Sequence, residues 1–155
     1  MNTRPTTAQL LEVVRRELAE LVAPAVSDPQ ATTSLQMIDH ILRTLAVRAD
    51  HEAGWMAEEM AAIEALAARV AGSDLPGAAA VTEALESFRS GRSTGQSTAD
   101  ITEDYNAATE VLSRCVEATF PAGGELRDAV DRLLDERLAH ETAVIGPDFQ
   151  LVGRQ

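Results

Sequence analysis

Two acidic residues, Glu52 and Glu59, lie one heptad apart on an otherwise apolar helical stripe, where their side chains suit chemistry better than packing. A second stripe near the end of the chain carries Arg137 and His140, three residues apart. If the two helices meet at this level, two carboxylates, a guanidinium and an imidazole lie together inside a helical bundle. Such a group suits a charged pairing that fixes helix register. It also suits a pocket for a small ligand or for catalysis.

These interpretations stay open, and the sequence favours the pairing. A further alternative is that the acidic positions face solvent near Gly54. We predict no metal site, because di-iron bundles need Glu-x-x-His on two helices and this chain has none. We assign no catalytic residue and no cofactor: Cys115 lies on an apolar stripe, and a phosphate loop needs a lysine, which the chain lacks.

The elements that position these residues are helices. From Leu35 to Val70, apolar residues recur at steps of three and four, typical of a helix lying along other helices. The pattern predicts a helix over about 29–71, ending at Gly72. Roughly 60 Å of helix exceeds the expected radius of gyration of about 15 Å several-fold. We therefore expect it to bend, to protrude or to be covered by a second chain. The phase does not change across Gly54, which predicts one continuous, bent helix.

The remaining stripes predict four further helices, over about 7–22, 76–90, 98–120 and 125–145. Thr6 with Gln9, and Ser97 with Asp100, have the spacing of capping boxes. We expect a single all-α domain over 1–155, an antiparallel bundle of about five helices, with a flexible loop at 91–97 and a tail at 146–155. Trp55 is expected to pack against a helix of its own chain, the alternative being an anchor for a partner.

Composition and charge argue against several classes of partner and location. The chain of 155 residues has a net charge of −12. This acidity argues against nucleic acid and against an anionic membrane surface as partners. No apolar run approaches the ~20 residues of a membrane span, and we read no signal peptide. With a single cysteine and therefore no internal disulfide, we expect a cytoplasmic protein.

The opening Arg4-Pro5-Thr6-Thr7-Ala8-Gln9-Leu10-Leu11-Glu12-Val13-Val14-Arg15-Arg16, with Ala23-Pro24-Ala25 after it, resembles a family of small uncharacterised bacterial helical proteins. The predicted helix over about 29–71 and the stretch from Val70 through Gly91 fit the same pattern, so the resemblance covers about ninety residues. Genes of that family lie near aminoglycoside-phosphotransferase-like kinases and acyl-CoA dehydrogenases. The resemblance implies an accessory protein near acyl-CoA or phosphotransfer metabolism, and defines no catalytic residues.

The sequence therefore favours a non-enzymatic accessory or protein-interaction module, a homo-oligomer such as a homodimer or a partner of another protein. The long helix, over about 29–71, is the expected contact surface. The alternative is a small-ligand-binding or enzymatic bundle with a polar site of Glu52, Glu59, Arg137 and His140.

Overall fold

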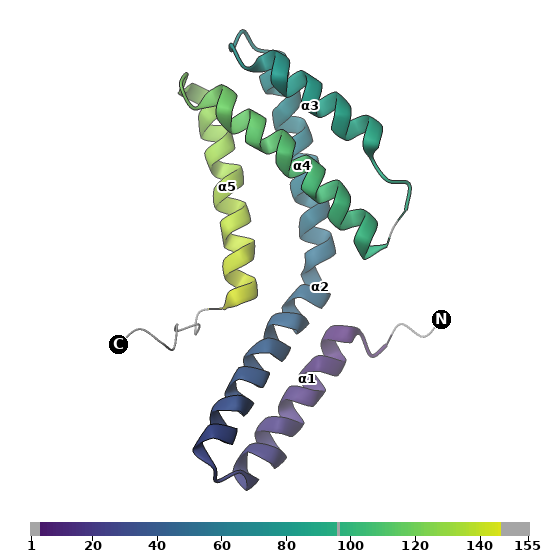
Figure 1. Cartoon of the computed structure of the whole chain (residues 1–155), viewed down its shortest axis with the longest axis vertical. Helices are drawn as coiled ribbons and strands as arrows, with labels where there is room; N and C mark the ends of the chain where they lie inside the picture. The colour runs from purple at the N-terminus through teal and green to yellow at the C-terminus, as the bar shows by residue number, and fades with distance from the viewer. Residues whose placement is uncertain (1–3, 96, 147–155) are drawn as a thin grey trace. The chain divides into compact units, whose positions relative to one another are not determined.

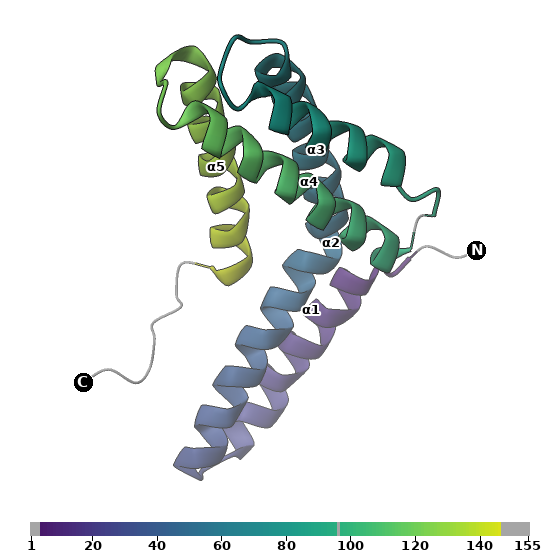
Figure 2. The same cartoon turned by 45° about the horizontal axis from the view of Figure 1, so that its top comes forward.

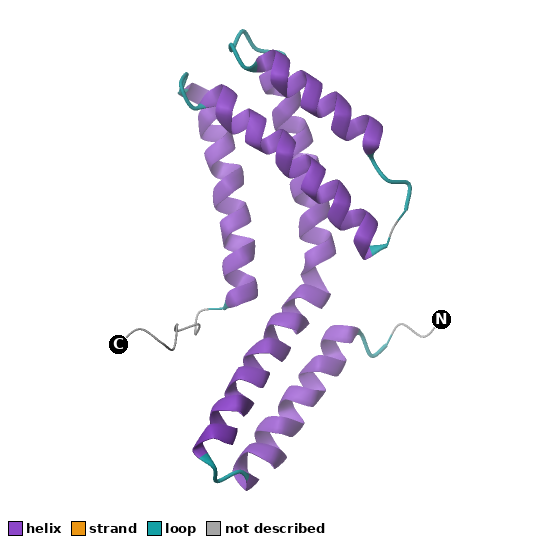
Figure 3. Ribbon diagram, in the orientation of Figure 1, coloured by secondary structure: helices purple, strands orange, loops and turns teal. Residues whose placement is uncertain are grey.

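The computed structural model describes residues 4–95 and 97–146 of the chain, and the described part is helical with no strand. Five α-helices follow one another among the described residues: α1 (Thr7–Glu17), α2 (Pro29–Ala71), α3 (Ala78–Gly91), α4 (Thr98–Thr119) and α5 (Gly124–Ile145). Figure 3 colours the helices purple and the loops between them teal. A π-helical turn, Leu18–Val22, and a 3-10 turn, Ala23–Ala25, connect α1 to α2. The predicted all-α fold with one long helix is confirmed. No helix of the described residues has the length and apolar character that crossing a membrane would need.

The long helix α2 is continuous across Gly54, as the unbroken phase of its apolar pattern predicts. Both predicted capping boxes are also present. The Thr6 and Ser97 hydroxyls each accept a hydrogen bond from the backbone N–H three residues on, and the Gln9 and Asp100 side chains bond back. The π-helical turn after α1 was not predicted, because its i to i+5 bonds leave no mark on a stripe this short.

Contacts between residues divide the chain into two compact units. The hairpin unit consists of residues 1–52 and 141–155, and the bundle unit of residues 53–140. The single-domain interpretation of the sequence stays a prediction. The expected tail at 146–155 lies outside the described residues except for Gly146.

The bundle unit has a continuous apolar core. The second half of α2 packs with α3, α4 and α5 around buried side chains, and ion pairs between helices lie at its surface, such as Arg89 with Glu64 and Arg69 with Glu125. The core residues are Met60, Ile63, Leu66, Ala67, Val70, Val81, Leu85, Phe88, Ala108, Val111, Leu112, Cys115, Ala118, Val130 and Leu133. The apolar pattern of α2 after residue 53 is therefore satisfied within the chain.

The hairpin unit is built differently. α1 lies antiparallel to the first half of α2, and the views in Figures 1 and 2 agree on this pairing. We call α1, its π-helical turn and residues 29–52 the hairpin. Only Ala46 and Gly146 are buried among the residues described for this unit. Ile38 and Leu45, which the apolar pattern predicts to face a partner, are instead exposed, because α1 covers only one side of α2.

Candidate functional site

Glu59 is the centre of a polar cluster inside the bundle unit. Its side chain projects from α2, is 7% exposed and accepts two hydrogen bonds. Its Oε1 lies 2.8 Å from His140 Nδ1 on α5, and its Oε2 lies 2.5 Å from the Tyr105 hydroxyl on α4. Both oxygens of this buried carboxylate are thus held by groups of the chain itself. One carboxylate joins three helices.

His140 is held on two sides. Glu59 holds its Nδ1, and the indole of Trp55 stacks on the imidazole with ring centroids 4.6 Å apart and planes 9° from parallel. Trp55 therefore packs against a helix of its own chain, as predicted. A carboxylate at Nδ1 favours the tautomer that leaves Nε2 as the acceptor. This is the orientation that metal-binding and general-base histidines have, although here the ring also serves as a packing surface.

Arg137 completes the cluster from the preceding turn of α5. Its guanidinium lies over the Tyr105 ring, 5.2 Å from the ring centroid, and its Nη1 is 3.5 Å from Thr109 Oγ1. A cation placed over an aromatic ring is attracted by the electrons of the ring face. Arg137 thus holds in place the tyrosine that bonds Glu59.

The predicted set of four residues is brought together only in part. Glu59, Arg137 and His140 meet in the bundle unit, whereas Glu52 belongs to the hairpin unit. There Glu52 accepts a hydrogen bond of 2.7 Å from Arg48 Nε, one turn earlier on α2. Ligand binding by these four residues stays a prediction.

Two members of the cluster, Tyr105 and Thr109, were not singled out from the sequence. Tyr105 lies on the apolar stripe of α4 at a step of four from Ile101, where the spacing alone indicates a core position. The sequence feature that could have indicated its role is the hydroxyl, because a buried tyrosine normally forms a hydrogen bond with a polar partner.

Chemically, the cluster offers a buried carboxylate and a histidine. The described residues contain no group of three or more His, Cys, Asp and Glu side chains arranged to hold a metal ion.

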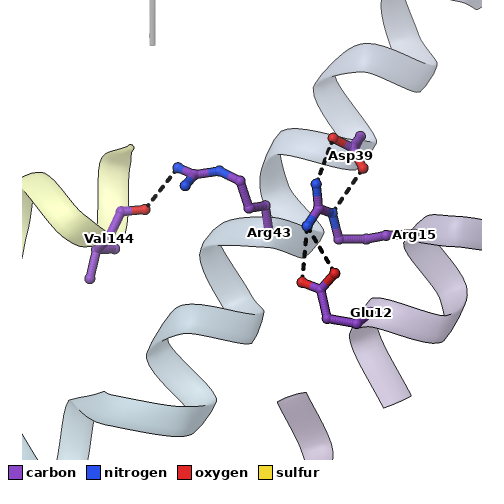
Figure 4. A network of polar contacts seen from close by, with 5 residues as sticks. All are labelled: Glu12, Arg15, Asp39, Arg43 and Val144. Carbon is purple, nitrogen blue, oxygen red and sulfur yellow. Dashed lines mark hydrogen bonds and ion pairs between the residues drawn. The ribbon is translucent and has the colours of Figure 1, made fainter. Parts of the chain in front are cut away.

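The hairpin unit has its own polar network, which Figure 4 shows at close range. Arg15 of α1 donates to both oxygens of Asp39 on α2, at 2.9 and 3.1 Å, and also bonds Glu12. The hydrogen bond to Asp39 raises the pKa of Arg15. On another side of α2, Arg43 donates to the carbonyl oxygen of Val144 at 3.3 Å. The paired charges of Arg15 and Asp39 fix the level at which α1 and α2 lie against each other.

One side of the hairpin exposes several large apolar side chains to solvent. Leu11 of α1, Leu18 of the π-helical turn, and Leu35 and Leu42 of α2 are half-buried, as expected where the two helices pair. We define the apolar face as Leu10, Val14, Leu21, Ile38, Ile41 and Leu45, whose exposed fractions run from 43% to 67%.

These six residues lie on one side of the hairpin. Leu10 and Val14 project roughly a quarter turn from the contact between the helices, and Ile38 and Leu45 are displaced by a similar angle in the same sense. Because α1 and α2 are antiparallel, displacements of the same sense bring both stripes to the same side. Arg43 is two residues from both Ile41 and Leu45, so it projects roughly 160° away from them around α2. The segment at Val144, whose carbonyl oxygen Arg43 bonds, therefore leaves this face open.

Comparison with models of protein families, with curated proteins and with solved structures finds no match to this chain.

Proposed function

We propose that the chain is a non-enzymatic interaction module that works by self-association, with the apolar face of the hairpin docked on the same face of a second copy. The observation that carries this proposal is the exposure of all six face residues on a unit that buries almost nothing of its own. Two helices alone are marginal in water, because most helical stability comes from packing an apolar side against other elements. A second hairpin supplies that packing and makes a four-helix bundle.

The extent of the face fits a dimer. Six large aliphatic side chains, each exposing about half of its surface, together offer several hundred Å², a large part of the ~800 Å² that a stable interface buries on each partner. Exposed apolar patches of that size on a monomer commonly mark interaction sites.

The charge of the chain is divided unevenly between its two units. Residues 53–140 carry sixteen acidic side chains and seven arginines, a net charge of −9. The hairpin unit carries nine acidic side chains and six arginines, a net charge of −3. The apolar face therefore lies on the part of an acidic chain where approach of an identical chain meets the least repulsion.

The proposal is tested by sedimentation equilibrium of the full chain from low to high micromolar concentration. We expect a reversible dimer. Ile41→Asp is expected to weaken it roughly 30- to 150-fold, because the half-exposed isoleucine of each copy loses roughly 1–1.5 kcal/mol of burial. The matched control is Gln36→Asp, which makes the same change in charge at an exposed position on another side of the same helix.

The control variant should dimerise like the wild-type chain. Far-ultraviolet circular dichroism checks that both variants are folded. A chain that stays monomeric at high micromolar concentration overturns the proposal, as does equal weakening by the two variants.

A further inference from the structure

The apolar face of the hairpin carries one charged side chain among its leucines, valine and isoleucines. Glu17, the last residue of α1, follows Val14 by three residues and precedes Leu21 by four, so the three project from about the same side. Glu17 also lies one heptad after Leu10, which rotates it by only about 20° from that residue. Like the six residues of the face, Glu17 is exposed. A second copy that covers the face therefore also covers this carboxylate.

Among the described residues of the hairpin unit, the Glu17 carboxylate has no hydrogen-bonding or charged partner. Its charged neighbours in the chain, Arg16 and Glu20, project toward the side of α1 that lies away from α2. From α2, the helix that pairs with α1, Asp39 and Arg43 project on the other side of the contact, where each already has a bonding partner. No cation of the same hairpin therefore compensates this charge when the face is covered.

Docking a second copy changes the surroundings of Glu17 in two ways. The apolar side chains of the other copy displace water from the carboxyl group, and burial without a partner disfavours its charged form. Two-fold symmetry also brings the Glu17 side chains of both copies into one interface, where two negative charges disfavour each other. Both effects act in the same direction, so the dimer holds protons that the separate chains release at neutral pH.

We infer that Glu17 makes self-association through the apolar face depend on pH, keeping it weak at neutral pH and strengthening it in mild acid. The inference rests on the proposed self-association and specifies how it is regulated. The sign follows from linkage: because the dimer takes up protons relative to the separate chains, the association constant rises as pH falls. One proton for each copy of Glu17 sets an upper limit of about a hundredfold per pH unit.

Sedimentation equilibrium of the full chain at about pH 7.5 and about pH 5.5 tests this role, with Glu17→Gln as the variant. Glutamine keeps the size of the side chain and removes its charge, so the variant should dimerise at least about tenfold more tightly than the wild-type chain at the higher pH. Between the two pH values, the wild-type chain should tighten at least about tenfold more than the variant. The matched control is Glu20→Gln, the same change at an exposed position off the apolar face, which should keep the wild-type pH dependence.

The possible failures are distinguishable. If the chains dimerise and the two variants behave alike, Glu17 does not regulate association, and the inference is wrong while self-association stands. Weaker association of Glu17→Gln also overturns the inference, because the carboxylate then pairs with a cation of the other copy. If all three chains stay monomeric at high micromolar concentration at both pH values, the inference and the proposed self-association are both wrong. Far-ultraviolet circular dichroism at each pH checks that the chains are folded.

Discussion

Replacing Glu59 by Gln should destabilise the bundle unit while preserving the shape of the side chain. The carboxylate accepts from Tyr105 and from His140 through different oxygens, but an amide has only one acceptor oxygen. One of the two bonds must therefore be lost or reversed at a site that is 7% exposed. Hydrogen bonds to charged groups contribute about 1.5–3 kcal/mol, and a reversed bond to the tyrosine hydroxyl recovers part of that. We expect a loss of about 1–3 kcal/mol in the free energy of unfolding.

Urea unfolding followed by the fluorescence of Trp55 measures this change, because the only tryptophan stacks on His140 within the cluster. For a chain of this size, the loss corresponds to a fall in melting temperature of about 3–10 °C. Glu58→Gln is the matched control. It makes the same chemical change one residue earlier, at an exposed position, and should stay within about 0.5 kcal/mol of the wild-type chain.

The pairing of Glu59 with Tyr105 can be isolated by a double-mutant cycle. Tyr105→Phe alone should cost about 1–3 kcal/mol, since it leaves a buried carboxylate oxygen without its donor. In the Glu59→Gln background, the same change should cost measurably less. If Glu59→Gln and Glu58→Gln unfold at the same urea concentration, or if the two substitutions are additive, the cluster does not stabilise the bundle and the structural reasoning is refuted.

Three further predictions concern glycine and cysteine positions. Gly54→Ala should raise the free energy of unfolding by up to about 1 kcal/mol in urea titrations, because the added Cβ meets no atom within 4 Å and alanine favours the helix; a loss of stability would contradict this. Gly77→Ala should instead lower it by about 1–3 kcal/mol in the same titration, since its Cβ would lie 2.6 Å from Cβ of Ala118 and force α3 away from α4; an unchanged midpoint would show that the contact is not tight. The thiol of Cys115, whose pKa burial raises to about 11, should react with a disulfide reagent at pH 8 only as fast as the protein unfolds, and immediate stoichiometric reaction would contradict its burial.

Much of the bundle could be predicted from the sequence because helical periodicity and capping are local properties. The stripe on α2 defined the side that carries Glu59, and the stripe on α5 defined the side that carries Arg137 and His140. Capping boxes at Ser97 and Thr6 follow from residue types three positions apart, so they needed no knowledge of tertiary packing.

The composition of the polar cluster could not be predicted completely. Periodicity says which side of a helix is buried but not the height at which two helices meet, and Tyr105 reaches Glu59 only because α4 and α2 pack at one particular level. The same limit of periodicity explains why Glu52 could not be distinguished from Glu59. It has the same heptad position as Glu59, and nothing in the spacing separates a carboxylate that finds a tyrosine and a histidine from one that pairs with Arg48 on its own helix.

The apolar pattern of α2 has two different outcomes along one continuous helix. After residue 53, the pattern is buried by α3, α4 and α5, which cover the helix on several sides. Before residue 53, α1 covers only the side that carries Leu35 and Leu42, so the same spacing leaves Ile38 and Leu45 exposed. A heptad pattern specifies that a helix has a partner, but it does not specify whether that partner belongs to the same chain. In the proposed dimer, a second copy packs on this uncovered half. Substitutions there should therefore alter the dependence of stability on protein concentration more than the stability of the bundle unit.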